Sequence, residues 1–341
     1  MRVKIRGIAQ LREAIPYLLG FSPEHSVVFV GLGPDDTVSI TGRIDAPTTA
    51  AEAADVARAI RTALAHTSVG PIVMAHFGDL DPHADQLAEQ IKMRPFALVI
   101  DMQLKNDGLM VADWSWADPL GKAEAVRASP PSIALANAIA GRQTFGTRAE
   151  LIRQVDPLPS GQRVVIAAYL QELPGLELPM TKLFSALEDV IVRDRLAYDS
   201  EYGRRPMSAE EIAMWCHALE RGVVRDAMLR LIVTGVEPIL DAIWLNIMQV
   251  APEDVVAPAA MLYATSMYLS GDGVLARSAT DRALRSRPNY AFAATIASAL
   301  DAGFPPKKFR SLMCEVMQLH DDSAQKLDGC DDEDVIGDCC L

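Results

Sequence analysis

The sequence predicts an α/β N-terminal domain with a mixed sheet, followed by an all-α C-terminal region that contains a tetratricopeptide-like (TPR-like) helical hairpin. Strand and helix patterns alternate over residues 1–118, as in an α/β domain. After that point the strand patterns fade, and helical patterns continue to residue 320. We therefore expect an α/β domain at 1–118, a helical domain at 119–320 and a disordered acidic tail at 321–341.

The first half of the α/β domain predicts a strand, a helix and a hairpin. Residues 2–6 alternate polar and apolar side chains, and apolar residues at helical spacing follow over 8–19 until Gly20. Residues 26–31 ("SVVFVG") form a continuous apolar run, whereas 38–45 ("VSITGRID") alternate. Because a short Gly-Pro-Asp turn separates these two runs, they predict an antiparallel hairpin.

The second half adds further helices and strands. The capping box "TAAE" at 49–52 predicts the start of a helix, and "PIVMAHF" at 71–77 predicts a buried strand. Asp81 then has the features of a helix N-cap. We expect 96–104 ("FALVIDMQL") to be a strand that returns through the turn "KNDG" into a last strand at 109–116. The predicted order is β-α-β-β-α-β-α-β-β.

The helical half carries two more capping boxes and one basic segment. "TRAE" at 147–150 and "SAEE" at 208–211 each predict a helix start. Acidic residues are interleaved with the arginines of the basic segment, which is typical of a solvated helix face. The arginines are Arg193, Arg195, Arg204 and Arg205.

One helical segment, near 259–302, has TPR-like spacing. Gly271, Ala276, Ala283 and Pro288 follow the second half of such a repeat, in which small alanines let two helices approach closely. Thr280 stands where a large aromatic residue or leucine is expected. A single TPR-like unit and an ordinary helical hairpin are both compatible with this pattern.

The composition is that of a globular protein. Of the 341 residues, 50% are hydrophobic and 23% are charged. The net charge is −13, of which the tail from Asp321 carries −7, with eight acids and one base, so the rest of the chain carries −6. This charge does not favour a nucleic-acid partner. No apolar run is long enough to span a membrane, and we find no secretory signal. The five cysteines form no framework, so we expect a cytoplasmic protein.

The richest polar segment is "HFGDLDPHAD", which follows the strand at 71–77. Two His and several carboxylates at a strand end are compatible with a divalent metal site. However, Asp81 is a natural N-cap, and acidic residues are favoured in the first turn of a helix. We therefore predict a helix start and no metal site. The residues concerned are His76, Asp79, Asp81, His83 and Asp85.

The turn "YLLGFSPEHSVVFVGLG" at 17–33 raises the question of an active site. Glu24, His25 and Ser26 are the residue types of a catalytic triad, but sequence neighbours on an extended turn point in different directions. The segment also lacks the glycines of a nucleophile elbow. The glycines that follow lead into a hairpin and not a helix, which excludes a dinucleotide fingerprint.

Two tryptophans alternate on the strand predicted at 109–116. Trp114 and Trp116 share one face of that strand. Aromatic side chains on one face either form a binding platform or cover a sheet. Both interpretations stay open.

Several motifs together resemble one protein family. These are "YLLGFSPEHSVVFVGL", "GRIDAP", "YLSGDGVLARSATDRALRSRPNY" and "ALDAGFPP". They resemble the domain of unknown function 4192 of actinobacteria and some of their phages, over about residues 3–310. The resemblance implies no established activity. It does imply that Glu24, Ser26, Arg43 and Asp45 fall on the family's pattern.

The chain departs from this pattern at three places. His25 replaces a usual acidic residue, and "HFGD" replaces a Thr-Asp-Asp type of strand end while retaining Asp79. A cysteine-bearing segment common in the family is replaced by "WSWADPLGK". This last departure argues against metal or thiol chemistry in that segment.

Two functions are therefore compatible with the sequence. The first is a cytoplasmic binding or adaptor protein, with a protein partner or a small ligand and with no nucleic acid or membrane as partner. The second is a hydrolase or nucleotide-acting enzyme that uses carboxylates at strand ends. The sequence does not identify a cofactor. The candidate ligand-binding residues are Glu24, Ser26, Arg43, Asp45, Asp79, Trp114 and Trp116.

Overall fold

The structure is a computed structural model. It describes residues 7–33, 37–67, 69–78, 86–115, 144–159, 161–173, 175, 178–198, 207–235 and 240–328, and the backbone alone for 9, 86–90, 194–198 and 318–328. The chain divides into two compact units. One unit comprises 1–156 and 298–304, and the other comprises 157–297 and 305–341.

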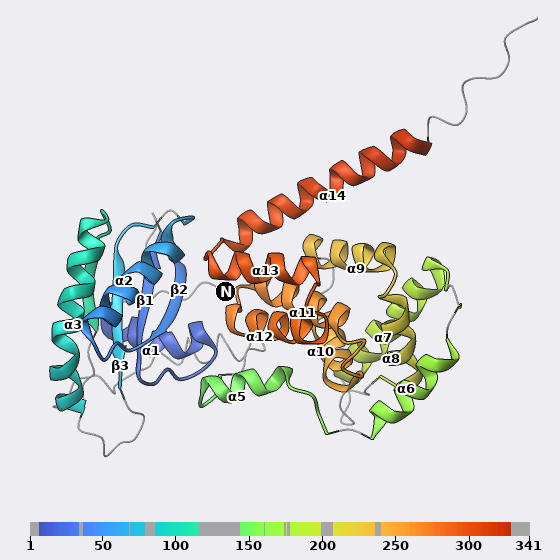
Figure 1. Cartoon of the computed structure of the whole chain (residues 1–341), viewed down its shortest axis with the longest axis horizontal. Coiled ribbons are helices and arrows are strands. Elements are labelled where there is room, and N and C mark those ends of the chain that lie inside the picture. Colours follow the sequence, from blue (N-terminus) through green and yellow to red (C-terminus); the bar gives the residue numbers. More distant parts are fainter. Residues whose placement is uncertain are drawn as a thin grey trace, which may run out of the picture. The chain divides into compact units, whose positions relative to one another are not determined.

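The first unit combines a sheet with helices (Figure 1). Its elements are α1 (Gly7–Leu19), β1 (Ser26–Leu32), β2 (Val38–Asp45), α2 (Ala50–Leu64), β3 (Ile72–Phe77), α3 (Gln86–Asn106), β4 (Val111–Ser115), α5 (Arg148–Ile152) and the 3-10 helix η1 (Arg153–Val155). The predicted α/β fold with a mixed sheet is confirmed.

The sheet has four strands in the order β2-β1-β3-β4. β1 pairs antiparallel with both β2 and β3, whereas β3 and β4 are parallel. The β1–β2 hairpin predicted from the sequence is confirmed. Because a parallel pair needs a crossover, α3 connects β3 to β4.

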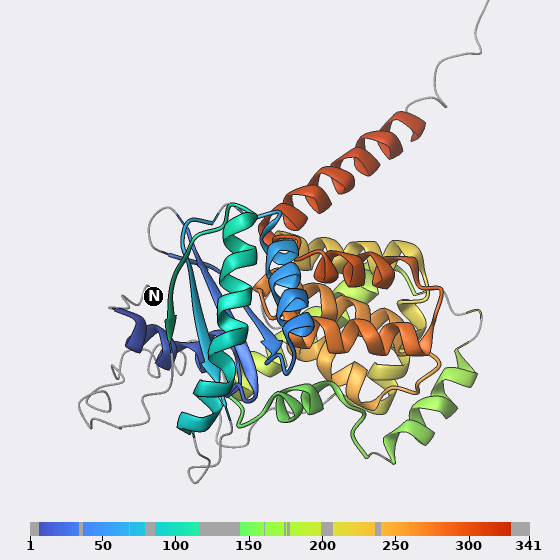
Figure 2. The same ribbon diagram turned by 60° about the vertical axis from the view of Figure 1, so that its left-hand side comes forward.

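The two central strands of the sheet, β1 and β3, are buried on both faces. Val27 and Phe29 of β1 belong to the apolar core that includes residues of α2 and α3, whereas Val28 and Val30 pack with residues of α1. α2 and α3 lie side by side over the first face (Figure 2). A strand that is buried on both sides needs a continuous apolar sequence, which explains the run in β1.

Gly42 of β2 is required by the packing of the α2/α3 face. A Cβ at this position would lie 2.3 Å from the ring of Phe29, its partner on β1. Real Cβ atoms do not approach other heavy atoms so closely, so only glycine fits beside this ring.

The predicted strand at 96–104 is wrong, because these residues belong to α3. The buried residues Met93, Ala97, Ile100 and Leu104 follow helical spacing, while Leu98, 64% exposed, lies between them. A short apolar run does not by itself distinguish a strand from a helix. The tertiary contact with the sheet decides for the helix.

The turn at "KNDG" reverses the chain, but it ends a helix instead of joining two strands. Gly108 has a φ of 79°, and its N–H donates to the carbonyl of Lys105. The N–H of Leu109 donates to Leu104. This left-handed glycine with two bonds back into the last turn is a common helix terminus. β4 therefore pairs with β3 and has no antiparallel partner at 96–104.

Several predicted features lie outside the described residues. They are the strand at 2–6, the helix start at Asp81 and residue 116 at the end of the last strand. The predicted domain boundary at 118 also lies outside them, so it stays a prediction.

The second unit is helical throughout its described residues. Its helices are α6 (Gln162–Glu172), α7 (Met180–Tyr198), α8 (Ala209–Ala218), α9 (Gly222–Thr234), α10 (Leu240–Val250), α11 (Ala257–Ser270), α12 (Gly273–Ser286), α13 (Ala291–Asp301) and α14 (Pro306–Asp328), with the end of α13 counted in the first unit. The predicted helical C-terminal region is confirmed.

α11 is the central helix of this unit. Its residues from Ala257 to Thr265 are all buried, and it packs against α9, α10, α12 and α14. A helix that is apolar on every side is stable only when neighbours surround it. Trp215 and Trp244 are fully buried in the same unit and meet edge to face at 5.7 Å between ring centroids.

α11 and α12 form the hairpin that the sequence predicts. Ala276 and Ala283 of α12 are fully buried, as close helix packing requires. Thr280 is also fully buried, and its hydroxyl donates to the carbonyl of Ala276 at 2.7 Å. The hairpin is present, and its likeness to a TPR unit stays a prediction.

The last helix extends into the segment predicted as a tail. α14 continues through Asp328, whereas the tail was expected from 321. Residues 329–341 lie outside the described residues. Among the described helices, none has both the length and the apolar content that crossing a membrane demands.

Candidate functional site at the end of the sheet

Four chain segments meet at one end of the sheet. β1 begins at Ser26, which pairs with Asp45 at the end of β2 and with Phe77 at the end of β3. Because β4 runs parallel to β3, its last residue, Ser115, lies toward the same end. Directly paired residues project from the same side of a sheet. Ser26, Asp45 and Phe77 therefore share one face, which is the face that α1 covers.

Arg43 joins two of the other predicted site residues, Asp45 and Glu24. It lies two residues before Asp45 on β2 and therefore on the same face. Its Nη1 is 2.5 Å from Asp45 Oδ1, and its Nη2 donates to the backbone carbonyl of Glu24 at 3.2 Å. The Arg43 side chain is 20% exposed and the Asp45 side chain is 84% exposed. The arginine thus connects the solvent-facing carboxylate to the turn before β1.

Backbone bonds hold this turn in place. The N–H of His25 donates to the carbonyl of Gly78 at 3.1 Å, and its carbonyl accepts from the N–H of Ala46 at 2.8 Å. His25 has a φ of 41°, which is uncommon outside glycine. The turn is therefore fixed to the residues that directly follow β2 and β3.

Two polar atoms of this cluster are buried without a hydrogen bond. The Ser26 side chain is fully buried, and neither its hydroxyl nor Arg43 Nε has a hydrogen-bond partner in the described part of the chain. Leaving such a group unsatisfied costs about 1–3 kcal/mol. The cluster therefore has unused hydrogen-bonding capacity.

Arg12 of α1 belongs to the cluster and was missed by the sequence analysis. Its guanidinium carbon lies 4.1 Å from the centre of the Phe77 ring, and its Nη1 donates to the Ser115 carbonyl at 3.0 Å. Burial lowers the pKa of Arg12 to about 10. The only sequence signal is a charged residue next to Leu11 within an apolar helical pattern.

Trp114, a predicted site residue, does not belong to this cluster. Trp114 pairs with Met74 and packs on the α2/α3 face, where its Nε1 donates to Asp101 at 2.8 Å. Trp116 and Asp79 lie outside the described residues. Trp114 therefore covers the opposite face of the sheet from Ser26.

The polar residues of "HFGDLDPHAD" are described only in part. His76 is buried on β3 and pairs with Val27, which places it on the α2/α3 face. Asp79, Asp81, His83 and Asp85 lie outside the described residues. Within the described chain, no three His, Cys, Asp or Glu side chains are grouped closely enough to hold a metal ion.

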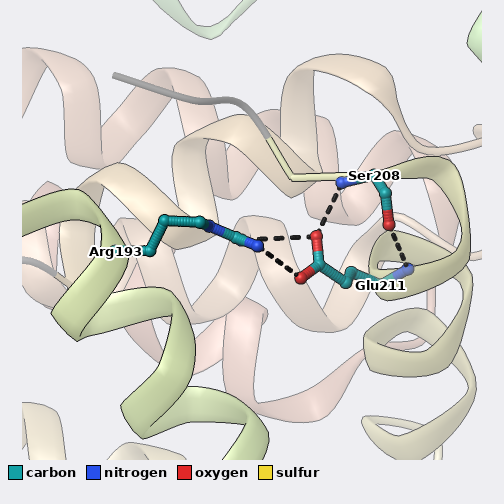
Figure 3. A network of polar contacts seen from close by, with 3 residues as sticks. All are labelled: Arg193, Ser208 and Glu211. Carbon is teal, nitrogen blue, oxygen red and sulfur yellow. Dashed lines mark hydrogen bonds and ion pairs between the residues drawn. The ribbon is translucent and has the colours of Figure 1, made fainter. Parts of the chain in front are cut away.

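The helical unit contains a second polar cluster, centred on Glu211 (Figure 3). Arg193 donates to both carboxylate oxygens, at 2.8 and 3.3 Å, and the N–H of Ser208 donates to one of them at 2.7 Å. The Ser208 hydroxyl accepts from the N–H of Glu211 at 3.1 Å, which completes the predicted capping box.

The surroundings of Glu211 change its pKa. Burial alone would raise this pKa, but the hydrogen bonds from Arg193 and Ser208 and the charge of Arg193 outweigh burial and lower it. Arg193 was predicted to belong to a solvated helix face, and instead it makes a half-buried bidentate ion pair. The other three arginines of that segment lie at positions whose side chains are not described.

The architecture defines this chain as a two-unit protein, with a mixed α/β sheet in one unit and packed helices in the other. The family described as Domain of unknown function (DUF4192) matches residues 9–307, and the chain belongs to this family. The resemblance predicted from the motifs is confirmed. Comparisons with curated proteins and with solved structures gave no match.

Proposed function

We propose that this chain is a binding protein whose α/β unit holds a small ligand at the end of the sheet. The supporting observation is the convergence of Glu24, Ser26, Arg43 and Asp45, which Arg43 and the β1–β2 register bring together. The unused hydrogen-bonding atoms of Ser26 and Arg43 are available to a ligand that displaces the present packing.

Binding fits this arrangement better than catalysis does. A nucleophilic serine needs a base within hydrogen-bond distance, and in the described chain no group bonds the Ser26 hydroxyl. The Asp45 side chain is 84% exposed and already paired with Arg43. The alternative is a hydrolase or nucleotide-acting enzyme, and it is favoured by one observation: Asp45 lies directly across from Ser26.

For the helical unit we propose contact with a partner protein. The support is the α11–α12 hairpin with its small buried alanines and TPR-like spacing. We further propose a cytoplasmic location, with neither nucleic acid nor membrane as a partner, on the basis of the net charge of −13 and the odd cysteine count. Cys216 is a free, buried thiol, and burial raises its pKa to about 12.

A metabolite panel tests the ligand site by thermal shift on the full chain. A stabilising metabolite should lose its effect in Arg43→Met and keep it in Arg58→Met. Arg58 is a matched control because it is an exposed arginine on α2 in the same unit, paired with Asp55. A metabolite that stabilises both variants equally would place the ligand elsewhere. Conversion of that metabolite into a product would establish the enzyme alternative.

The partner proposal needs a separate test. Affinity capture from the native cytoplasm should identify a protein that forms a stoichiometric complex when both components are purified. If no metabolite stabilises the chain and no purified candidate forms a complex, the binding function is contradicted in both of its parts.

A further inference from the structure

Arg12 occupies a defined position above the ends of the strands. α1 lies on the face of the sheet where Leu11 and Ile15 pack with Val28 and Val30. The Arg12 guanidinium is held by its contact with the Phe77 ring and by its bond to the Ser115 carbonyl. An aromatic face and a carbonyl oxygen both attract a cation, and together they limit its freedom.

The charge of Arg12 has no acidic partner in the described part of the chain. Its contacts there are the Phe77 ring and the Ser115 carbonyl, and neither carries a full negative charge. Glu13 follows in α1 about 100° further around the helix and makes no ion pair with it there. Arg43 differs, because Asp45 pairs with it. A half-buried cation that lacks a carboxylate is unusual, because charges removed from water are normally paired.

The neighbouring groups suit an anion. A guanidinium has five N–H donors, of which one is bonded to Ser115. Ser26 lies directly across from Phe77, and cross-strand partners have Cβ atoms about 5 Å apart. The unbonded Ser26 hydroxyl is therefore next to the ring on which Arg12 stacks. An oxyanion at this position would accept from the guanidinium and from the hydroxyl.

We propose that Arg12 is the anion-recognition residue of the site at the end of the sheet, which takes the carboxylate or phosphate group of a small molecule, with Ser26 as a second donor. This inference rests on the ligand site proposed above and specifies the ligand's chemical class. Arginine forms paired, charge-assisted hydrogen bonds with either group. Burial lowers the pKa of Arg12 to about 10, so the side chain is protonated at neutral pH.

The experiment uses the full chain and two probes, inorganic phosphate and acetate, at constant ionic strength. Binding is followed in ¹⁵N–¹H spectra that include the arginine Nε–H groups, because these report on Arg12 directly. We expect one or both probes to bind and to shift the Arg12 signal. Losing one charge-assisted contact weakens binding by about tenfold or more, and this is expected for Arg12→Met. Ser26→Ala should weaken binding by a smaller factor, and Arg58→Met should not change it.

The outcomes separate this inference from the proposed function. Equal probe affinities in wild type and Arg12→Met, or no probe binding in wild type, would overturn the anion site. If a metabolite then still stabilises wild type but not Arg43→Met, the ligand-binding function survives without it. Arg12→Gln is a second neutral variant, and its probe affinity is measured instead if Arg12→Met does not fold. Phosphate and acetate titrations compared with each other decide between the two anion classes.

Discussion

The sheet-end cluster and the Glu211 cluster differ in how completely their polar atoms are hydrogen-bonded. In the Glu211 cluster, Arg193 and Ser208 bond both carboxylate oxygens, and the Ser208 hydroxyl is used as well (Figure 3). In the sheet-end cluster, Ser26 and Arg43 each leave a buried atom unbonded in the described chain. A closed network stabilises a fold, whereas open donors are what a ligand needs. The comparison therefore supports a stabilising role for the Glu211 cluster and supports our proposal that the sheet-end cluster binds a ligand.

The largest decrease in the free energy of unfolding is expected when Glu211 is replaced. Glu211→Ala removes the acceptor for Arg193 and for the Ser208 N–H, so we expect the free energy of unfolding to fall by about 2 kcal/mol. Urea denaturation followed by circular dichroism measures this change. Glu210→Ala is the matched control, because Glu210 is an exposed neighbour in the same first turn, and its loss should stay under about 0.5 kcal/mol. Equal losses for the two variants would mean that the closed network contributes nothing.

The part of the stability that depends on the ionisation of Glu211 should be smaller than the loss in Glu211→Ala. The folded pKa of Glu211 is lowered from its ordinary 4.5, so its ionised form stabilises the fold above that value. The stability difference between wild type and Glu211→Gln should be about 1 kcal/mol at pH 7. It should shrink as the pH falls below 4.5 and through the folded pKa, because Glu211 then becomes protonated. A difference that stays constant from pH 7 to pH 3 would exclude this origin.

The Ser208 hydroxyl is expected to contribute less to the stability of the fold than the whole Glu211 cluster does. Ser208→Ala should lower the free energy of unfolding by about 1 kcal/mol, because the N–H of Glu211 loses its acceptor. Ser208→Gly should lower it by only about a few tenths of a kcal/mol, because glycine is tolerated at an N-cap. The two variants, compared by thermal denaturation, separate the cap from the ion pair. A larger loss in the glycine variant would contradict this assignment.

The smallest effect is expected at Arg12. Arg12→Met removes a hydrogen bond and a cation–π contact, but it also removes a charge whose burial is unfavourable, so the net change should be under about 0.5 kcal/mol. Arg193→Met is the matched arginine of the closed cluster and should lose about 2 kcal/mol. Urea denaturation of both variants measures the contrast. A loss at Arg12 as large as that at Arg193 would make Arg12 a structural residue.

Local sequence patterns predicted three strands of the α/β unit and the capping box of a helix in the other unit. The apolar run from Ser26 and the alternating run from Val38 are β1 and β2, and the segment at 71–77 contains β3. The capping box at Ser208 is complete in the structure. These features depend on side-chain period and on bonds within one helical turn, which a short segment contains in full.

The error at 96–104 shows the limit of local patterns. Nine apolar-rich residues fit a buried strand and a helix segment equally well. Only a longer stretch reveals the spacing of Met93, Ala97, Ile100 and Leu104, and only the sheet provides the surface that buries them. The turn residues at 105–108 were identified correctly as a chain reversal, but not as the end of a helix.

By itself, the sequence determined the fold class and the family. It also identified four site residues that lie close together, because all four belong to one hairpin and the turn before it. These residues are Glu24, Ser26, Arg43 and Asp45. Only the tertiary structure placed Trp114 on the opposite face and brought in Arg12. Arg12 meets Ser115, 103 residues away, because α1 packs across the sheet. A contact at that separation depends on how the helix packs on the sheet, and no local period or spacing encodes it.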